Sequence, residues 1–253
     1  MWTIKEYYNN GYLAKLKARI VSINWNKIEL DKTIAFPEWW WQEWDKWIIT
    51  LIKNEVKINF IDTQKSLWRM IFLDDFPTIN VDTTVKHIIS DENKDLLKLA
   101  KVWDEVIIEI DILRREKLST SHTASHLLYI WVLKTRPEAI EKIKWCHISE
   151  ENARFDFHIE EKFSEEDICR IVKTVNNLII KDLEIKTYQH QKESEALFWE
   201  CDNIIIPCWW THLEKTWNIL ESFIKRKNIW KWKERLIINF PNAKFDLNKY
   251  FIK

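Results

Sequence analysis

The sequence predicts an α+β protein in which a small β-barrel is followed by an α+β domain with an antiparallel sheet. Two observations lead to this prediction. Short runs rich in β-branched residues, separated by turn residues, dominate the first part of the chain, whereas helical and strand-like patterns alternate from Leu118 onward. We therefore place the barrel domain at residues 1–112 and the second domain at residues 113–253. A chain of 253 residues is long enough for one compact unit or two small domains.

Many short strands joined by turns are typical of a small barrel. The strand-like segments are residues 13–23, 27–30, 48–52, 56–61 and 106–110. Turn residues join them at positions 24–26, which read Asn-Trp-Asn, and at positions 53–55, which read Lys-Asn-Glu. These turns predict that neighbouring strands pair as antiparallel hairpins.

Two helices are expected in the second domain. The first covers residues 121–134 and ends before Arg136 and Pro137, because a proline disfavours helical backbone in the residue before it. The second begins at Ser164, a helix-capping residue followed by three acidic residues. Strand-like segments lie at residues 155–159, 185–188, 204–206, 220–224 and 236–240. Together they predict a mixed domain built on an antiparallel sheet.

Charge and composition restrict the class of protein. Lys plus Arg and Asp plus Glu both number 39, so no overall field attracts nucleic acid, and any RNA contact must be local. No apolar run approaches the ~20 residues of a membrane span. The first residues lack the apolar core of a signal peptide, and the four cysteines are irregularly spaced. We expect a cytoplasmic protein with no membrane partner, and a monomer is favoured.

The chain contains seventeen tryptophans and one glycine, whereas average usage of about 7% predicts roughly 18 glycines. The tryptophans stand at turn positions, as at residues 39–41 and 209–210, where backbone freedom selects glycine. We predict that most of them are glycine in the native protein, through a UGA codon that the source lineage reads as glycine. Trp68 and Trp131 fit this prediction least, and Trp131 lies inside a predicted helix, where glycine costs roughly 1 kcal/mol relative to alanine. The alternative is a Trp-rich protein that binds sugars or stacked bases.

Two pairs of side chains predict a zinc site. His122 and His126 are four residues apart on a predicted helix and therefore share one face, and Cys208 and His212 have the same spacing beside a turn. Nitrogen and sulfur donors are those that zinc prefers. His122, His126 and Cys208 are the firm ligands, with His212 as a fourth that yields or shares its place. An open zinc could bind an α-amino group or lower the pKa of a water toward ~7, whereas four protein ligands are typical of structural zinc.

With tryptophan read as glycine, FPEWWWQEWDKW at residues 36–47 becomes a glycine-rich stretch around Gln42, and CWWTH at residues 208–212 becomes Cys-Gly-Gly-Thr-His. Together with SHTASHLL at residues 121–128, these motifs make the chain similar to the editing domain of alanyl-tRNA synthetase. It resembles even more the free-standing AlaX-type trans-editing proteins. The resemblance extends from about residue 12 to residue 240, and it implies a barrel like those of translation factors.

The resemblance also implies site residues. The glycine-rich stretch would line the editing pocket with Gln42 facing the zinc, and Thr33 matches a threonine of the family's motif. Thr123 and Ser125 lie between the two helical histidines and could also contact the substrate. Each assignment has a structural alternative. The glycine-rich stretch could be a flexible loop, Thr33 an ordinary threonine of a strand, and Thr123 and Ser125 ordinary residues at the start of a helix. The catalytic candidates are therefore Gln42, Thr33, Ser125 and Thr123.

Basic residues provide candidate RNA contacts. Lys225, Arg226, Lys231 and Lys233 cluster near the C-terminus, and Arg114 and Arg115 precede the predicted histidine helix. Such a run is either a solvated charged face or a surface that contacts phosphates of a tRNA 3′ end. The sequence leaves both interpretations open.

The favoured function is zinc-dependent hydrolysis, in trans, of alanine tRNA mischarged with serine or glycine. Three alternatives are an editing module that clears serine from threonine tRNA, a non-catalytic zinc-stabilised RNA-binding module, and a Trp-rich ligand-binding protein. To spare alanyl-tRNA, the site needs a polar group that forms a hydrogen bond with the serine hydroxyl. Such a site discriminates by a factor of ~10⁴ against the analogue that lacks the hydroxyl. Thr33 and Gln42 are expected nearest, with Ser125, Thr123 and Thr211 in reserve.

Overall fold

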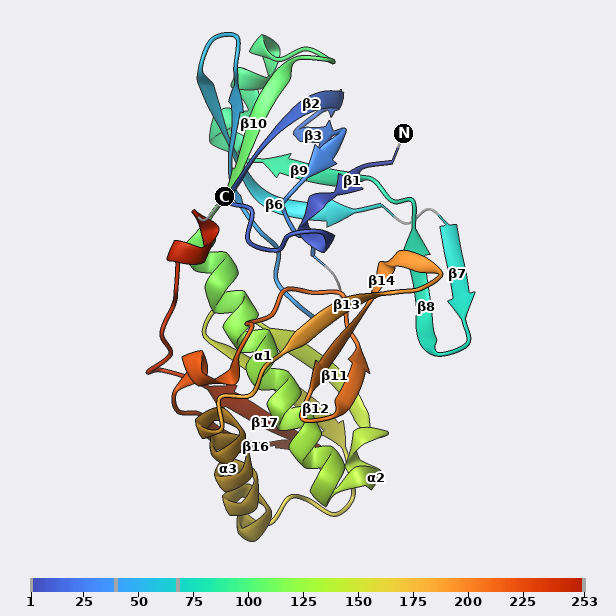
Figure 1. Cartoon of the computed structure of the whole chain (residues 1–253), viewed down its shortest axis with the longest axis vertical. Coiled ribbons are helices and arrows are strands. Elements are labelled where there is room, and N and C mark those ends of the chain that lie inside the picture. The colour runs from blue at the N-terminus through green and yellow to red at the C-terminus, as the bar shows by residue number, and fades with distance from the viewer. Residues whose placement is uncertain (1, 39–40, 67–68, 252–253) are drawn as a thin grey trace.

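The computed structural model describes residues 2–38, 41–66 and 69–251. A β-barrel lies at one end of the molecule, and one long helix, α1 (Ile112–Thr135), leads from it into the sheets of the second domain (Figure 1). Over the described ranges, no helix has the length and apolar character that a membrane span requires. The architecture confirms the predicted α+β class with an N-terminal barrel.

The barrel closes in the strand order β10-β2-β3-β9-β6-β5, and every pair in it is antiparallel. Its strands are β2 (Lys15–Asn24), β3 (Lys27–Leu30), β5 (Trp47–Leu51), β6 (Val56–Lys65), β9 (Val85–Ile89) and β10 (Glu105–Ile110). Buried aliphatic side chains alternate along the strands, as in Ile49 and Leu51 of β5, and fill the interior. The short strands β1 (Ile4–Lys5) and β4 (Lys32–Thr33) pair beside the barrel in parallel.

The left-handed backbone of several tryptophans agrees with the glycine prediction. Trp25, in the predicted turn between β2 and β3, has φ 54°, and Trp103 and Trp232 have φ 74° and 67°. Residues with a Cβ rarely adopt this region, which glycine adopts freely. Trp131, in contrast, lies in α1 and is buried in the hydrophobic core outside the barrel. The predictions for residues 39, 40 and 68 lie outside the described residues.

Helix α1 begins well before the predicted residue 121, so the expectation that Arg114 and Arg115 precede it was wrong. Asp111 caps it by accepting a hydrogen bond from the Arg114 amide (3.0 Å). The first turns bury polar side chains, including Glu116. These residues interrupt the apolar stripe on which a helix prediction depends.

The second domain is built on the antiparallel sheet β11-β12-β17-β16, packed against α1 and α3 (Glu165–Ile180). Its strands are β11 (Ile143–Ile148), β12 (Asn152–His158), β16 (Phe223–Trp230) and β17 (Lys233–Asn239). The predicted capping residue Ser164 is confirmed, since it forms a capping box with Asp167. The predicted strand at residues 220–224 starts only at Phe223, because a 3-10 helix (Thr216–Ile219) and Leu220, with φ 59°, come before it.

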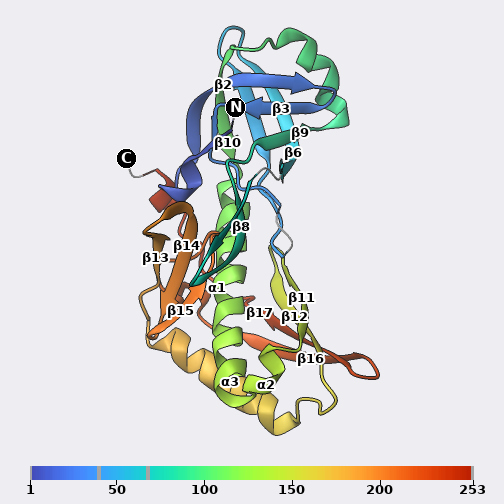
Figure 2. The ribbon, with the colours of Figure 1, turned by 90° about the vertical axis from the view of Figure 1, so that its right-hand side faces the viewer.

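A second sheet lies on the other side of α1 (Figure 2). It consists of β13 (Lys186–His190), β14 (Glu193–Cys201) and β15 (Ile204–Pro207), of which the sequence did not predict β14. The hairpin of β7 (Arg69–Leu73) and β8 (Phe76–Val81) leaves the barrel domain and packs on this sheet through an apolar cluster that includes Phe76 and Ala196. The two domains therefore contact each other beside the loop that follows β15.

Candidate metal centre and its cavity

Four side chains converge in the second domain as a candidate metal centre. Cys208 Sγ lies 3.5 Å from His122 Nε2 and 3.3 Å from the Nε2 atoms of His126 and His212. The four donor atoms lie within 4.8 Å of one another, and all four side chains are buried. The two predicted pairs therefore meet at one point and can hold a metal ion.

Local structure sets each pair, and one hydrogen bond joins them. His122 and His126 are one turn apart on α1, with their rings 4.9 Å apart and nearly parallel. Cys208 directly follows β15, and His212 lies one residue before Leu213. The Leu213 amide donates to Thr123 Oγ1 (3.0 Å), which fixes the Cys208–His212 segment to α1. Thr123 thus has a structural partner between the two helical histidines.

Burial keeps the three imidazoles neutral. It lowers the pKa of His126 to about 3, and it lowers the pKa values of His122 and His212 well below the ordinary range, with neighbouring histidines adding to the effect. Burial also raises the pKa of the Cys208 thiol to about 12. Neutral imidazoles have free lone pairs, and a bound cation stabilises a thiolate. The centre is therefore suited to a cation and unsuited to holding protons.

Gln42 contacts the ring nitrogen of His122 that does not face Cys208. Its Oε1 lies 2.6 Å from His122 Nδ1, so that a proton on Nδ1 is donated to the amide oxygen and Nε2 is left free to bind a metal. Gln42 itself is buried and bridges to Ile148 of β11. The amide of Ile148 donates to the Trp41 carbonyl (2.6 Å), and the amide of Glu43 donates to the Ile148 carbonyl (3.1 Å). The geometry makes Gln42 a positioning residue for His122.

A buried ion pair anchors the loop that carries Gln42. Asp45 and Arg115 are each 1% exposed, and Arg115 Nε lies 3.1 Å from both carboxylate oxygens of Asp45. Arg115 also donates to the carbonyls of Gly11 and Ile34 (2.7 Å each). Asp45 in turn accepts from the Phe36 amide (2.6 Å). The pair therefore joins the loop, the barrel and α1.

Arg114 is also occupied by protein groups. It donates to the Trp44 carbonyl (2.9 Å) and to Glu43 (2.9 Å), and it contacts Glu150. Its side chain is 7% exposed. Since Arg114 and Arg115 are buried and paired, the expectation that they contact tRNA finds no support in the structure.

Two other predicted site residues have partners away from the donor atoms. Thr33 lies 2.9 Å from His87 Nε2 and accepts from the Ala35 amide (3.1 Å), both within the barrel domain. Ser125 donates to the His122 carbonyl (2.7 Å) inside α1. The expected substrate contact of Thr33 therefore finds no support. The Ser125 hydroxyl, in turn, is used in a hydrogen bond to the backbone of its own helix.

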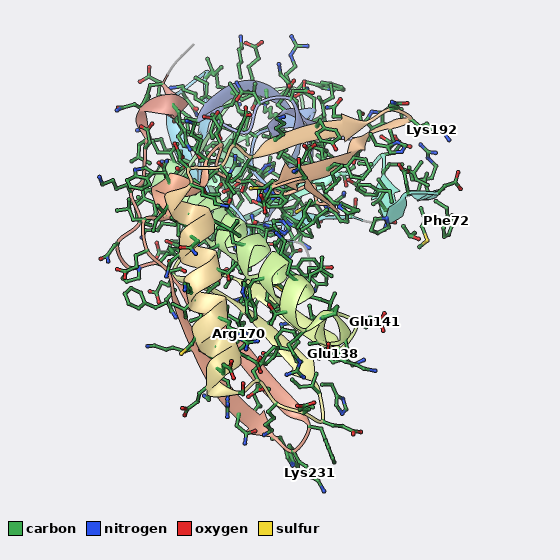
Figure 3. All side chains as sticks on the ribbon, turned by 60° about the horizontal axis from the view of Figure 1, so that its bottom comes forward. Phe72, Glu138, Glu141, Arg170, Lys192 and Lys231 are labelled. Atoms are coloured by element: carbon green, nitrogen blue, oxygen red, sulfur yellow. The ribbon has the colours of Figure 1, made fainter. Side chains whose placement is uncertain are left out.

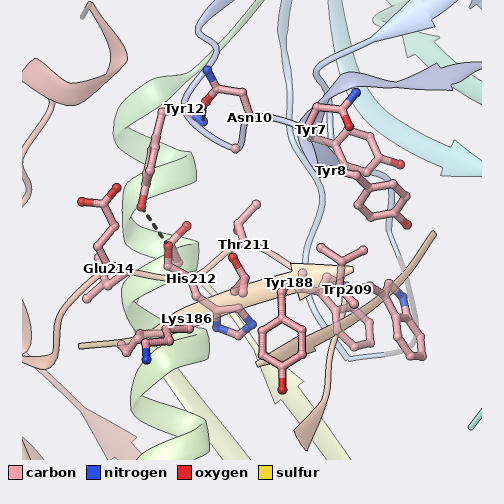
Figure 4. A pocket seen from close by; sticks show the side chains of 18 of the residues that line it. Tyr7, Tyr8, Asn10, Tyr12, Lys186, Tyr188, Trp209, Thr211, His212 and Glu214 are labelled. Atoms are coloured by element: carbon pink, nitrogen blue, oxygen red, sulfur yellow. Dashed lines mark hydrogen bonds between the residues drawn. The ribbon is translucent and has the colours of Figure 1, made fainter. Parts of the chain in front are cut away.

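A cavity of about 850 Å³ opens beside the metal centre (Figure 4). Its walls come from the N-terminal segment Tyr7, Tyr8 and Tyr12, from β13 with Tyr188, and from residues 209–215, including His212. Sequence reasoning missed the N-terminal part. The cluster of tyrosine and asparagine around the one glycine, EYYNNGY at residues 6–12, was the available signal.

Indole rings enclose the donor atoms. The Trp210 ring lies 5.3 Å from the His122 ring and stacks on Trp209 (5.0 Å) and Trp41 (6.5 Å). On the other side, the Trp199 ring lies 4.6 Å from that of His126. Trp209 and Trp210 also line the cavity beside His212, so these two indoles occupy part of the space next to the metal centre.

The C-terminal basic residues lie on the β16–β17 hairpin, which extends away from the body of the molecule with Lys231 at its tip (Figures 2 and 3). Lys225, Lys231 and Lys233 are exposed. Arg226 instead pairs with the buried Glu234 (2.8 Å). Arg226 is exposed as well, so all four basic residues predicted on this hairpin face solvent, and the three lysines do so without an ion pair to Glu234.

Comparison with known proteins gives a relative of matching length. The chain is 28% identical over 239 residues to the alanyl-tRNA editing protein AlaX-M of Pyrococcus horikoshii, covering 92% of this chain and 96% of that protein. It is also 28% identical over 191 residues to AlaX-M of Saccharolobus solfataricus, covering 76% of this chain and 70% of the relative. The chain resembles the AlaX-type editing proteins. This confirms the resemblance that the motifs predicted.

A second group of relatives consists of longer proteins, of which the chain matches only one region. The chain is 26% identical over 197 residues to an alanine–tRNA ligase of Saccharolobus islandicus, which covers 78% of this chain and 20% of the ligase. No family model matches the chain. The match to AlaX-M of Pyrococcus horikoshii, in contrast, extends over nearly the whole length of both proteins.

Proposed function

We propose that the chain is a zinc-dependent aminoacyl-tRNA deacylase that acts in trans in the cytoplasm. It removes serine or glycine wrongly attached to alanine tRNA. The observation that carries the proposal is the convergence of His122, His126, Cys208 and His212 in a chain that is similar to AlaX-M over 92% of its length. The exposed lysines of the β16–β17 hairpin are the proposed tRNA contacts.

The donor distances fit zinc. Zinc–sulfur and zinc–nitrogen bonds of about 2.3 and 2.0 Å at a tetrahedral angle place the two donors about 3.5 Å apart. The Cys208 Sγ to Nε2 distances are 3.3–3.5 Å. Zinc held there would supply a Lewis acid for the ester carbonyl. Gln42 fixes the ring of His122, and the Asp45–Arg115 pair fixes the loop that carries Gln42.

The proposed glycines create access for the ester. With glycine at positions 41, 209 and 210, the stacked indoles beside His122 would be absent, which would open the cavity from His212, which already lines it, toward His122. With tryptophan, the four donor side chains stay between 2% and 9% exposed. We therefore expect UGA codons at these positions, and call the chain with glycine at each UGA-encoded position the glycine form. UGG codons at residues 39–41, 209 and 210 would overturn the recoding proposal.

The decisive experiment is a deacylation assay of the glycine form. Seryl-tRNA and alanyl-tRNA for alanine, and seryl-tRNA for threonine, serve as parallel substrates, and elemental analysis measures zinc. We expect one zinc per chain and preferential hydrolysis of the seryl ester on alanine tRNA. Preferential action on threonine tRNA would reassign the module. Zinc without hydrolysis of any ester would make it a non-catalytic RNA-binding module.

A further inference from the structure

We infer that the C-terminal segment, residues 240–251, is a strap that positions the metal ligand His212 through Tyr12. Lys249 and Tyr250 on the strap, together with Tyr12, are the positioning residues. After β17 the chain runs back along the molecule and reaches the first turns of α1 (Figure 1). The inference rests on the zinc site of the proposed function, because His212 is positioned there as one of its four donors.

A buried carboxylate on α1 anchors the strap. Glu116 is 0% exposed, Lys249 Nζ donates to its Oε1 (2.8 Å), and the Tyr250 hydroxyl donates to its Oε2 (3.2 Å). Burial raises the pKa of Glu116, and the Lys249 ammonium acts in the opposite direction. A carboxylate buried without such partners would be costly, and Glu116 lies outside the donor cluster. Glu116 is therefore the attachment point of the strap on α1.

The strap fixes the ring of Tyr12. Lys249 Nζ lies 4.5 Å from the centroid of that ring, and the Tyr250 ring packs edge-on against it at 5.5 Å. An ammonium over an aromatic face is attracted by the electrons of the ring. The backbone is held as well, since Arg115 donates to the carbonyl of Gly11, the preceding residue (2.7 Å). Tyr12 is therefore fixed in both its side chain and its main chain.

Tyr12 in turn contacts the peptide unit that follows His212. Its hydroxyl lies 3.5 Å from the His212 carbonyl oxygen (Figure 4). The amide of the same peptide unit belongs to Leu213 and donates to Thr123 Oγ1 (3.0 Å). Burial, and next the carboxylate of Glu214, raise the pKa of Tyr12, so that the hydroxyl is a donor. Because a peptide unit is planar, partners at its two ends fix its rotation.

These contacts form a closed circuit that begins and ends on α1. The helix holds the strap through Glu116 and holds the Leu213 amide through Thr123. Removing a group that orients a metal ligand typically lowers metal affinity by about 10–100-fold. Loss of the strap contact should therefore loosen His212, the ligand expected to yield its place, while all four donors remain.

Zinc affinity of the glycine form, measured by competition with a chromophoric chelator, tests the inference without turnover. Tyr12→Phe keeps the ring beside Lys249 and Tyr250 and removes only the hydroxyl, so we expect zinc to bind about tenfold more weakly. Lys249→Met should act in the same direction, whereas Lys249→Arg keeps the cation over the ring and should retain the parent affinity. The double variant Tyr12→Phe/Lys249→Met should bind zinc no more weakly than the weaker single variant, since both act through one route.

Tyr129→Phe is the matched control for the loss of a tyrosine hydroxyl. Tyr129 is half-buried on α1, its ring packs near Phe155 with centroids 6.5 Å apart, and it lies outside the donor cluster. This variant should leave zinc affinity unchanged. Should Lys249→Met fail to fold, Tyr12→Phe and its control carry the test.

Hydrogen exchange of the Leu213 amide gives a second measurement that works in the metal-free protein. Tyr12→Phe should accelerate this exchange by about fivefold, the factor that corresponds to one neutral hydrogen bond. Unchanged zinc affinity or unchanged exchange in Tyr12→Phe, or additive effects of the two single variants, would overturn the inference. If the parent binds no zinc or hydrolyses no ester, the proposed function fails, and the exchange measurement still decides the inference.

Discussion

The buried histidines of the barrel and of the second domain differ in the partners of their ring nitrogens. His87, in the barrel, has partners at both ring nitrogens, since Nδ1 lies 3.1 Å from the Ile28 carbonyl and Nε2 lies 2.9 Å from Thr33 Oγ1. In the second domain the Nε2 atoms of three histidines face one sulfur, and His212 Nδ1 has no partner among the described residues. The comparison teaches that the fold itself completes the hydrogen bonds of the barrel histidine, whereas the three histidines of the second domain direct ring nitrogens at one sulfur, as ligands of a common metal ion would.

The largest expected effect comes from removing one metal donor. Cys208→Ala should abolish most bound zinc and lower the melting temperature, because zinc binding to a site of this kind contributes free energy to folding. Elemental analysis and thermal unfolding measure both effects. Cys201→Ala is the matched control, since Cys201 is also buried but lies outside the donor cluster, and it should retain zinc. Equal zinc content in the two variants would remove Cys208 from the site.

Breaking the ion pair that anchors the Gln42 loop should have the next largest effect. Asp45→Ala leaves the Arg115 guanidinium buried without its partner, which should lower the free energy of unfolding by about 3–5 kcal/mol. Denaturant unfolding measures it. Glu166→Ala removes the exposed pair with Arg170 and should cost no more than ~0.5 kcal/mol. A similar cost for both variants would show that the loop is held by other contacts.

The barrel histidine should give stability a dependence on pH. Burial lowers the pKa of His87 to about 4 from 6.5, so the unfolded chain binds more protons than the folded chain between these values. His87 therefore contributes stability at neutral pH that is lost as the pH falls through this window, by about 2 kcal/mol at pH 5. The difference in unfolding free energy between the wild type and His87→Gln should shrink accordingly from pH 7 to pH 5. A difference independent of pH would contradict this account.

The smallest expected effects come from substituting Thr33 in the barrel and Thr211 beside the metal centre. Thr33→Val removes a hydroxyl that the barrel completes, so it should cost about 1–3 kcal/mol of stability and lower hydrolysis of seryl- and alanyl-tRNA equally. Thr211→Val should instead narrow the ratio of the two rates by about tenfold or more. Single-turnover deacylation by the glycine form measures both. A selective effect of Thr33→Val alone would return the hydroxyl-reading role to the barrel.

Local sequence patterns were sufficient for the metal donors and for most strands. A spacing of four residues on a helix puts His122 and His126 on one face whatever surrounds them, and alternation in β5 and β12 follows from the pleat of a strand. The start of α1 could not be predicted in this way. Its first turns bury Arg114, Arg115 and Glu116, whose partners come from distant segments.

Only the tertiary structure decided which buried polar groups find a hydrogen-bond partner within the protein and which do not. The sequence favoured Thr33 over Thr211 as the hydroxyl nearest to the substrate, yet packing gives Thr33 a hydrogen bond with His87 and leaves Thr211 in the lining of a cavity. The cavity itself joins the N-terminal tyrosines to residues that lie more than half the chain away. Such pairings depend on the burial of remote segments against one another, whereas local periodicity reports only on neighbours along the chain.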